Sequence, residues 1–441
     1  MWRTSATFLK NLKHIPLPDF QRSETANAFQ TLLSRMSVSF LSFQDFRSMN
    51  FGAKISLGVE EFEALRIYEN SPSELKGILQ TMLDLKREYS TYTKQSLIFI
   101  ADIAFYKEWW QAYIALEPVN RCIFQINYNL ITLSDSYSNV TILWGTFHPW
   151  LKALGYIWNA WGDISQWFFK IFFAKGKFHK DIKSIHARQF YDSLFASLPQ
   201  LVQSLEQSEN KIQDSRVYKR LHQYLTIVVP TIHYYFHALH CDNYESFFKL
   251  QTQLFLLILH CRAREYSVAF VHNQILWHYW KTSCLQQLLK RHWLLNEEIG
   301  EITLSILARS AQNTPEHVKT QQLVENYSLI THVHHMSLHW NDAPISASTR
   351  KQQDIQLNLV EAFEQQLKQQ PPVWGTEVKD AKGKTLNIIW DFLDDTDFQG
   401  QLYLHFESVN RLWLTPSKSS LTRIQASQVE KKYTDLFQAF L

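Results

Sequence analysis

A short stretch with the period of β-strands, residues 97–144, lies between much longer stretches whose apolar residues recur with the period of a helix. Within it, residues 97–106 (LIFIADIAFY) form an apolar run whose length and Ile/Phe content favour a buried strand. Residues 122–133 alternate in polarity and predict a second strand, and residues 140–144 predict a third. We therefore expect an α+β protein that is predominantly helical, with a small mixed β-sheet (about 96–144) covered by helices.

Helical patterns surround this stretch on both sides. Residues 71–89 begin with a capping box, and residues 149–173 repeat large aromatic side chains at helical spacing. Residues 231–292 predict two helices that are joined near Asp242, and a Gln-rich helix ends before Pro371. Four regions follow from this pattern: a loosely attached N-terminal arm (1–58), a helical region (59–94), a core domain (95–320) and a C-terminal helical region with a small β element (321–441).

Composition narrows the class of protein. Aromatic residues make up 15% of the chain, which indicates a packed globule, and the low counts of Gly (11) and Pro (12) disfavour an all-β sandwich. The four cysteines are far apart and form no C-x-x-C pair, so we expect reduced thiols and an intracellular protein, nuclear or cytoplasmic. We expect no secretory signal and no transmembrane segment, because no unbroken apolar run is long enough.

Asp102 is the first candidate site residue, because it interrupts the apolar run at 97–106. A buried carboxylate needs a cation or hydrogen bonds, so Asp102 is either a strand-borne metal ligand or an Asp at a strand end that caps a turn. Clustered acids are found later in the chain at Glu297, Glu298 and Glu301, which share one helical face. These acids either pair with a cation or with an arginine (Arg262, Arg264 or Arg309), or favour the positive end of a helix that is capped by Asn296.

Histidines supply further candidate ligands. His148 lies between a predicted strand and Pro149, and ends of strands are where sites form. His233, His237 and His240 follow the pattern H-x3-H-x2-H on a predicted helix, which can bind zinc, although surface histidines next to aromatic residues give the same pattern. The same two interpretations apply to a second group, His332, His334, His335 and His339.

A basic tract spans residues 170–188, with five lysines and one arginine against one aspartate. Phenylalanines lie between these charges, and such a mixture suits a phosphate backbone with splayed bases; a solvated connector is the alternative interpretation. The net charge of the whole chain, +3, is too small to indicate a nucleic-acid partner. The nucleic-acid-binding candidates are Lys170, Lys175, Lys177, Lys180, Lys183 and Arg188.

Three segments, in order, resemble an uncharacterised transposase-like family of eukaryotic genomes rich in mobile elements. Residues 144–159 (WGTFHPWLKALGYIWN) are similar to its Gly-x-x-His segment before a helix, residues 243–248 with 260–280 to its acidic loop and Tyr-Ala-Arg helix, and residues 304–319 to its closing segment. The resemblance covers about residues 95–320. It departs at Ser310 and Ala311, where the family places an Asp, and no acid is close to His148 in the sequence.

This resemblance implies an RNase H-like core with acidic ligands for a divalent metal, Mg or Mn. By position, the resemblance implies Asp102 as the first acid and Glu316 as the last. Together with the local patterns above, the candidate catalytic residues are Asp102, Glu298 and Glu316, and the candidate metal ligands are Asp102, Glu301 and His148. The expected function is that of a mobile-element-derived nucleic-acid-binding or transposase/nuclease-like protein with DNA as partner. Such a protein is either an active nuclease or a relative that has lost catalytic activity. The alternative is a non-catalytic helical scaffold that binds another protein.

Overall fold

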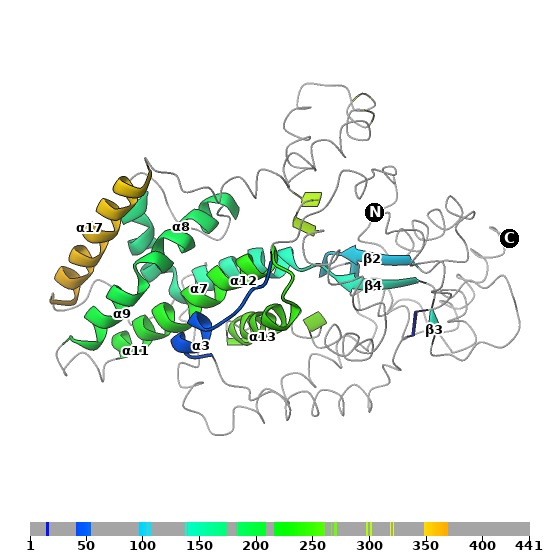
Figure 1. The fold of residues 1–441 in the computed structure, drawn as a ribbon, viewed down its shortest axis with the longest axis horizontal. Helices are drawn as coiled ribbons and strands as arrows, with labels where there is room; N and C mark the ends of the chain where they lie inside the picture. Colours follow the sequence, from blue (N-terminus) through cyan, green and yellow to red (C-terminus); the bar gives the residue numbers. More distant parts are fainter. Residues whose placement is uncertain are drawn as a thin grey trace, which may run out of the picture.

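The structure is a computed structural model. It describes residues 15–16, 41–53, 97–103, 105–106, 137–138, 140–173, 182, 184–208, 216–260, 266, 269–270, 297–298, 300–301, 318, 321 and 348–368. This part of the chain is 81% helical, which confirms the predominantly helical class. None of its helices is long and apolar enough to cross a membrane. The helices gather at one end of the molecule, and a pair of strands lies at their edge (Figure 1).

The strand predicted at 140–144 is confirmed, and the one predicted at 97–106 is confirmed for its first half, residues 97–101. Strand β2 (Leu97–Ala101) pairs in parallel with β4 (Val140–Trp144), in the register Leu97 opposite Val140 and Ala101 opposite Trp144. A separate antiparallel contact joins β1 (Ile15–Pro16) to β3 (Tyr137–Ser138). The strand predicted at 122–133 lies outside the described residues, and an RNase H-like core is not shown by the part that is described.

Helix α7 (Phe147–Phe172) follows β4 directly and confirms the aromatic helix predicted at 149–173. It bends at Trp161, whose backbone angles (φ −131°, ψ 26°) leave the helical range just before Gly162. At this bend Arg220, whose side chain is 3% exposed, makes two 2.6 Å hydrogen bonds to Asp163 and one of 2.7 Å to the carbonyl of Ala160. The guanidinium thereby bridges a carbonyl and a carboxylate on the two sides of the bend.

The other long helices form a bundle with α7 (Figure 1): α8 (Ser184–Ala196), α9 (Leu198–Glu206), α11 (Arg216–Gln223), α12 (Val229–Ala238), α13 (Tyr244–His260) and α17 (Ser348–Lys368). Of these, α8, α12, α13 and α17 pack directly on α7. A π-helical turn, η3 (Tyr224–Val228), joins α11 to α12 without a break. Pro230 follows this turn and has no N–H to donate back into it, which accounts for the local change of hydrogen bonding. The break near Asp242 is confirmed, and α17, which ends at Lys368, confirms the Gln-rich helix predicted before Pro371.

The core of the described part is built from aromatic side chains. Trp150 and Trp161 are buried, and Trp150 lies 4.8 Å from Phe236 between ring centroids. Phe168 stacks on Tyr224 and on Phe363 of α17, so a helix from the end of the described chain completes the bundle. The high aromatic content is therefore used to bury large flat surfaces between helices.

Residues 41–53, within the predicted N-terminal arm, lie against the end of α12 and the start of α13. Helix α3 (Phe43–Arg47) begins with a capping box between Ser42 and Asp45. Gly52 adopts a positive φ of 72°, which a side chain would strain, and the next residue, Ala53, donates a 2.8 Å hydrogen bond to the Asp242 carboxylate. This segment is attached to the bundle by hydrogen bonds, and the division into four regions stays a prediction.

Several predictions fall on residues that the structure does not describe. These are the helix at 71–89, the His332–His339 group, and the small β element of the C-terminal region.

Candidate functional site

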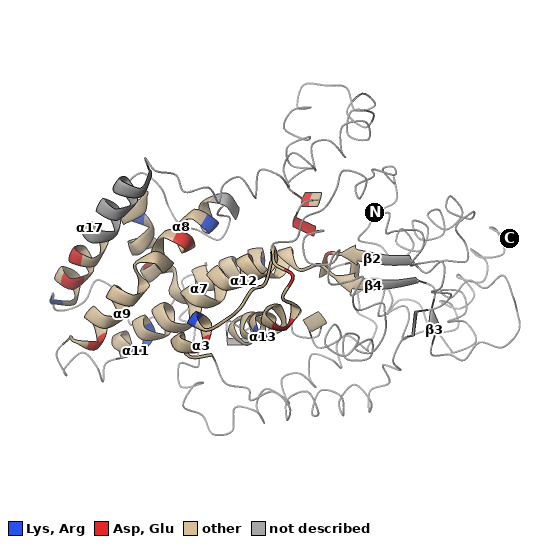
Figure 2. Ribbon diagram, viewed as in Figure 1, with Lys and Arg blue, Asp and Glu red and all other residues tan. Residues whose placement is uncertain are grey.

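The carboxyl ends of β2 and β4 meet the start of α7. The parallel pairing continues one step past the strands, where the Gly145 N–H donates a 3.0 Å hydrogen bond to the carbonyl of Ala101. Asp102 and Gly145, the residues that directly follow β2 and β4, therefore lie next to each other at the same end of the strand pair. The acidic residues at 297–301 lie beside this edge (Figure 2). Side chains that follow adjacent parallel strands converge at one edge, which is where sites form in such sheets.

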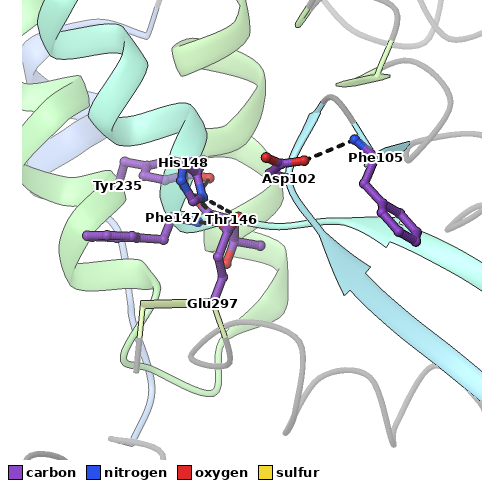
Figure 3. A network of polar contacts seen from close by, with 7 residues as sticks. All are labelled: Asp102, Phe105, Thr146, Phe147, His148, Tyr235 and Glu297. Carbon is purple, nitrogen blue, oxygen red and sulfur yellow. Dashed lines mark hydrogen bonds and ion pairs between the residues drawn. The ribbon is translucent and has the colours of Figure 1, made fainter. Parts of the chain in front are cut away.

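Asp102 lies just after strand β2, which fits the second of its two predicted roles, an Asp at a strand end that caps a turn. Strand β2 ends at Ala101, and a helical turn starts at once, with the Tyr106 N–H bonded to the Asp102 carbonyl at 3.0 Å. The Asp102 carboxylate is exposed and accepts a 3.0 Å hydrogen bond from the Phe105 N–H through Oδ1 (Figure 3). Asp102 thus caps a turn at a strand end. The strand prediction ran too far because apolar residues on the next helical turn extend the apolar pattern beyond the strand.

Glu297 is the most connected acid at this edge. Its side chain is 8% exposed, and one oxygen accepts hydrogen bonds from the backbone N–H groups of Phe147 (2.6 Å) and His148 (3.0 Å). These are free donors in the first turn of α7, where Thr146 makes no side-chain cap, so Glu297 caps the helix from a distant part of the chain. Gly145 makes this approach feasible, because a methyl group there would overlap the Glu297 carboxylate.

The second Glu297 oxygen lies 2.5 Å from Nδ1 of His148 (Figure 3). Since a carboxylate only accepts, Nδ1 carries the proton, and the imidazole is held in one orientation with Nε2 pointing away from the pair. The hydrogen bond to Glu297 raises the pKa of His148 above its ordinary value against the opposing effect of burial, and the negative charges of Glu297, Glu301 and Asp102 act in the same direction.

Helix α12 fixes the start of α7 from the other side. The Tyr235 hydroxyl donates a 2.7 Å hydrogen bond to the Thr146 carbonyl, and Trp150 Nε1 donates one of 3.1 Å to the Ile232 carbonyl. Tyr235 is fully buried, and burial with the nearby Glu297 charge raises the pKa of its hydroxyl well above the usual range. The His148–Glu297 pair is therefore held by a rigid frame, which suits a site that must position a proton or an ion.

The other predicted acids take different positions. Glu298 is 1% exposed and points to His240, with 3.0 Å between Oε2 and Nε2, while Glu301 is exposed. Glu316 lies outside the described residues. The structure thus brings Asp102, His148 and Glu297 to one edge, and it pairs Glu298 with a histidine that the sequence pattern grouped with His233 and His237.

The predicted zinc group divides in two. His240 turns toward Glu298, whereas His233 and His237 both approach Asp192 on α8. Within the described part of the chain, these three residues are the one group whose potential ligand atoms all lie within 4.8 Å of one another. Asp192 was missed in the sequence because nothing in its spacing ties it to residues about forty positions later.

The structure describes two of the six basic candidates. Lys170 is exposed near the end of α7, and Arg188 on α8 lies 3.7 Å from Asp192 with its guanidinium over the Phe236 ring. Lys175, Lys177, Lys180 and Lys183 lie outside the described residues. A contact with DNA stays a prediction for all six.

Comparisons with models of protein families, with curated proteins and with solved structures find no match. The resemblance to a transposase-like family consequently stays an expectation, and any function rests on the geometry of the chain itself.

Proposed function

We propose that this protein is a nucleic-acid-binding, nuclease-like protein whose divalent metal, Mg or Mn, binds at the edge formed by Asp102 and His148. The observation that carries the proposal is the Glu297–His148 pair at the carboxyl end of two parallel strands, with Asp102 at the end of the neighbouring strand. A histidine whose one nitrogen is held by a carboxylate, with the other directed away, is the arrangement that proteins use for metal-bound imidazole.

The residues present fit such an ion. Asp102 is exposed and uses Oδ1 for its cap, so a second oxygen remains to meet a cation. The negative charges of Asp102 and Glu301 both help to raise the pKa of His148. Both carboxylates are therefore close enough to His148 to interact with the same ion. In this proposal Asp102 and His148 hold the ion, Glu301 completes its surroundings, and Glu297 orients His148. Such an ion supplies charge stabilisation to a phosphate group when bound.

The basic tract at 170–188 supports a nucleic-acid partner. It begins at the exposed Lys170 at the end of α7, the helix whose start carries His148. One helix therefore joins the proposed metal edge to the tract that would contact phosphates. At a rise of 1.5 Å per residue, about 33 Å of the bent helix α7 lies between His148 and Lys170.

The binding half of the proposal is tested by measuring DNA affinity as a function of salt. We expect the logarithm of the affinity to fall linearly with the logarithm of salt concentration. Replacing Lys175, Lys177 and Lys180 by Ala should reduce the slope by about 1 for each lysine that neutralises a phosphate. A variant with Lys219 and Lys249 changed to Ala, both exposed elsewhere on the bundle, is the control. Absence of binding at low salt would leave the protein-binding scaffold as the better interpretation.

The metal half is tested by thermal unfolding with Mn²⁺ or Mg²⁺. Binding to the native state should raise the unfolding midpoint of the wild type and not that of Asp102→Asn, which retains an oxygen for the cap but loses the charge. Glu245→Gln, an exposed acid on α13, is the matched control and should behave as the wild type. Equal shifts in wild type and Asp102→Asn, or none in either, would remove the metal from this edge.

A further inference from the structure

A second cluster of metal-binding side chains lies away from the strand edge, between α8 and α12. His233 Nδ1 is 2.8 Å from Asp192 Oδ1, and His237 Nε2 is 3.6 Å from the same oxygen. His233 and His237 are one helical turn apart on α12, and Asp192 faces them from α8, which packs on α12. The three potential ligand atoms all lie within 4.8 Å of one another.

Neighbouring side chains hold this cluster in place. The His233 ring stacks on Phe195 with 4.0 Å between centroids and an angle of 8° between ring planes, and only 12% of its side chain is exposed. Arg188 Nε is 3.7 Å from the other Asp192 oxygen, so the carboxylate points one oxygen at the histidines and the other at the guanidinium. The ligand atoms are thereby oriented before any ion arrives, as neighbours of metal ligands commonly do.

The spacing fits a tetrahedral ion. Zinc bonds of about 2.0–2.1 Å to nitrogen and oxygen set ligand atoms about 3.3 Å apart, between the two distances observed here. We propose that Asp192, His233 and His237 form a site for Zn²⁺ or a similar transition-metal ion, separate from the proposed Mg or Mn edge. The ion takes the place of the proton that joins His233 to Asp192, which is released to solvent, and it is bound by Nδ1 of His233, Nε2 of His237 and Oδ1 of Asp192.

The ligand set selects the class of ion. Two imidazoles suit zinc, copper or nickel, whereas Mg²⁺ and Ca²⁺ are held mainly by oxygen ligands. The side chains of His237 and Asp192 are 42% and 39% exposed, so an ion can reach the cluster from solvent. With three protein ligands the fourth position faces solvent and takes water or an external ligand, as in zinc sites with an open position.

The proposal is tested by titrating the full-length, metal-free protein with Co²⁺, whose visible absorption reports a tetrahedral site, followed by displacement with Zn²⁺. His237→Gln removes one ligand at a largely exposed position, and Asp192→Asn removes the charge. His186→Gln is the matched control, because His186 is an exposed histidine on the same helix as Asp192. Circular dichroism of each metal-free variant verifies that the fold is intact.

We expect the wild type and His186→Gln to bind one more equivalent of Co²⁺ than His237→Gln and Asp192→Asn. Changes to the groups that orient metal ligands weaken metal sites about 10–100-fold, so removal of a direct ligand should weaken this equivalent by at least about 100-fold. The difference between variants isolates this cluster from ions bound by other histidines. Equal stoichiometry and affinity in all four proteins would overturn the proposal, as would displacement of Co²⁺ by Mg²⁺ at comparable concentration.

Discussion

Two imidazole–carboxylate pairs in this structure shift the pKa of their histidine in opposite directions. One is His148 with Glu297 at the strand edge, and the other is His233 with Asp192 between α8 and α12. At the strand edge the hydrogen bond to Glu297 outweighs burial and raises the pKa of His148. Between α8 and α12 burial outweighs the hydrogen bond to Asp192 and lowers the pKa of His233, with the charges of His237 and Arg188 acting in the same direction. One imidazole is thus biased toward its protonated form and the other toward its neutral form.

The carboxylates differ as much as the histidines. Glu297 is 8% exposed and serves a single helix start, whereas Asp192 is 39% exposed and is shared among two histidines and an arginine. Burial would raise the pKa of the Asp192 carboxyl, but its hydrogen bonds and the charges of both histidines together hold this pKa well below the usual value. The comparison shows that the identity of a His–carboxylate pair does not set its protonation; the surrounding charges and solvent do.

The largest expected effect comes from removing each carboxylate. Glu297→Ala takes away a helix cap and a charged hydrogen bond in a buried place, and should lower the free energy of unfolding by about 2–4 kcal/mol. Asp192→Ala, at a half-exposed position where solvent screens the ion pairs, should lower it by about 1–2 kcal/mol. Urea unfolding of both variants measures the difference. Equal losses would mean that the two carboxylates contribute alike and would break the comparison.

A substitution at Gly145 tests the close approach of the Glu297 carboxylate to the backbone. Gly145→Ala places a methyl group where the carboxylate lies, and should destabilise the protein by about 1–3 kcal/mol through overpacking. In a Glu297→Ala background most of this destabilisation should disappear, because the overlapping atoms are gone. A double-mutant cycle by urea unfolding tests this coupling, and strict additivity of the two changes would contradict the close approach.

The two histidines should give opposite dependences of stability on pH. Because the folded pKa of His148 is raised, its contribution is fully present below the unfolded value of about 6.5 and is lost as pH rises through the folded pKa. For His233 the folded pKa is lowered, so stability falls as pH drops from about 6.5 toward the folded pKa. Each slope is at most about 1.4 kcal/mol per pH unit for one proton. His148→Gln should flatten the first slope and His233→Gln the second.

Asp102 should give the smallest effect. Asp102→Ala removes an exposed cap on the Phe105 N–H and should lower the free energy of unfolding by about 1 kcal/mol, less than Glu297→Ala. Chemical denaturation without added metal measures this, with Asp102→Asn as the control that keeps the cap. A decrease as large as that of Glu297→Ala would mean that Asp102 is structurally equivalent to Glu297.

Local sequence patterns predicted most helices and strands but not the tertiary contacts between them. The strand at 140–144 and the helix from Pro149 were predictable because apolar and aromatic side chains repeat with the right period. The end of β2 was not, since Ile103, Phe105 and Tyr106 continue the apolar run into a helical turn. Glu297 was noted as one of a cluster of acids, but its partner His148 lies 149 positions away, and a distance of that kind leaves no trace in local spacing.

The attachment of residues 41–53 has a consequence for how the protein folds. Ala53, Leu41 and Asn50 reach Asp242, Gln253 and Ser246, across 189 to 212 positions of sequence. Closing loops of this length carries an entropy cost that local helix contacts do not, and contacts distant in sequence slow folding. We expect α12 and α13 to form first and this segment to dock last. It should also be the first of these elements to detach when hydrogen exchange is followed under native conditions.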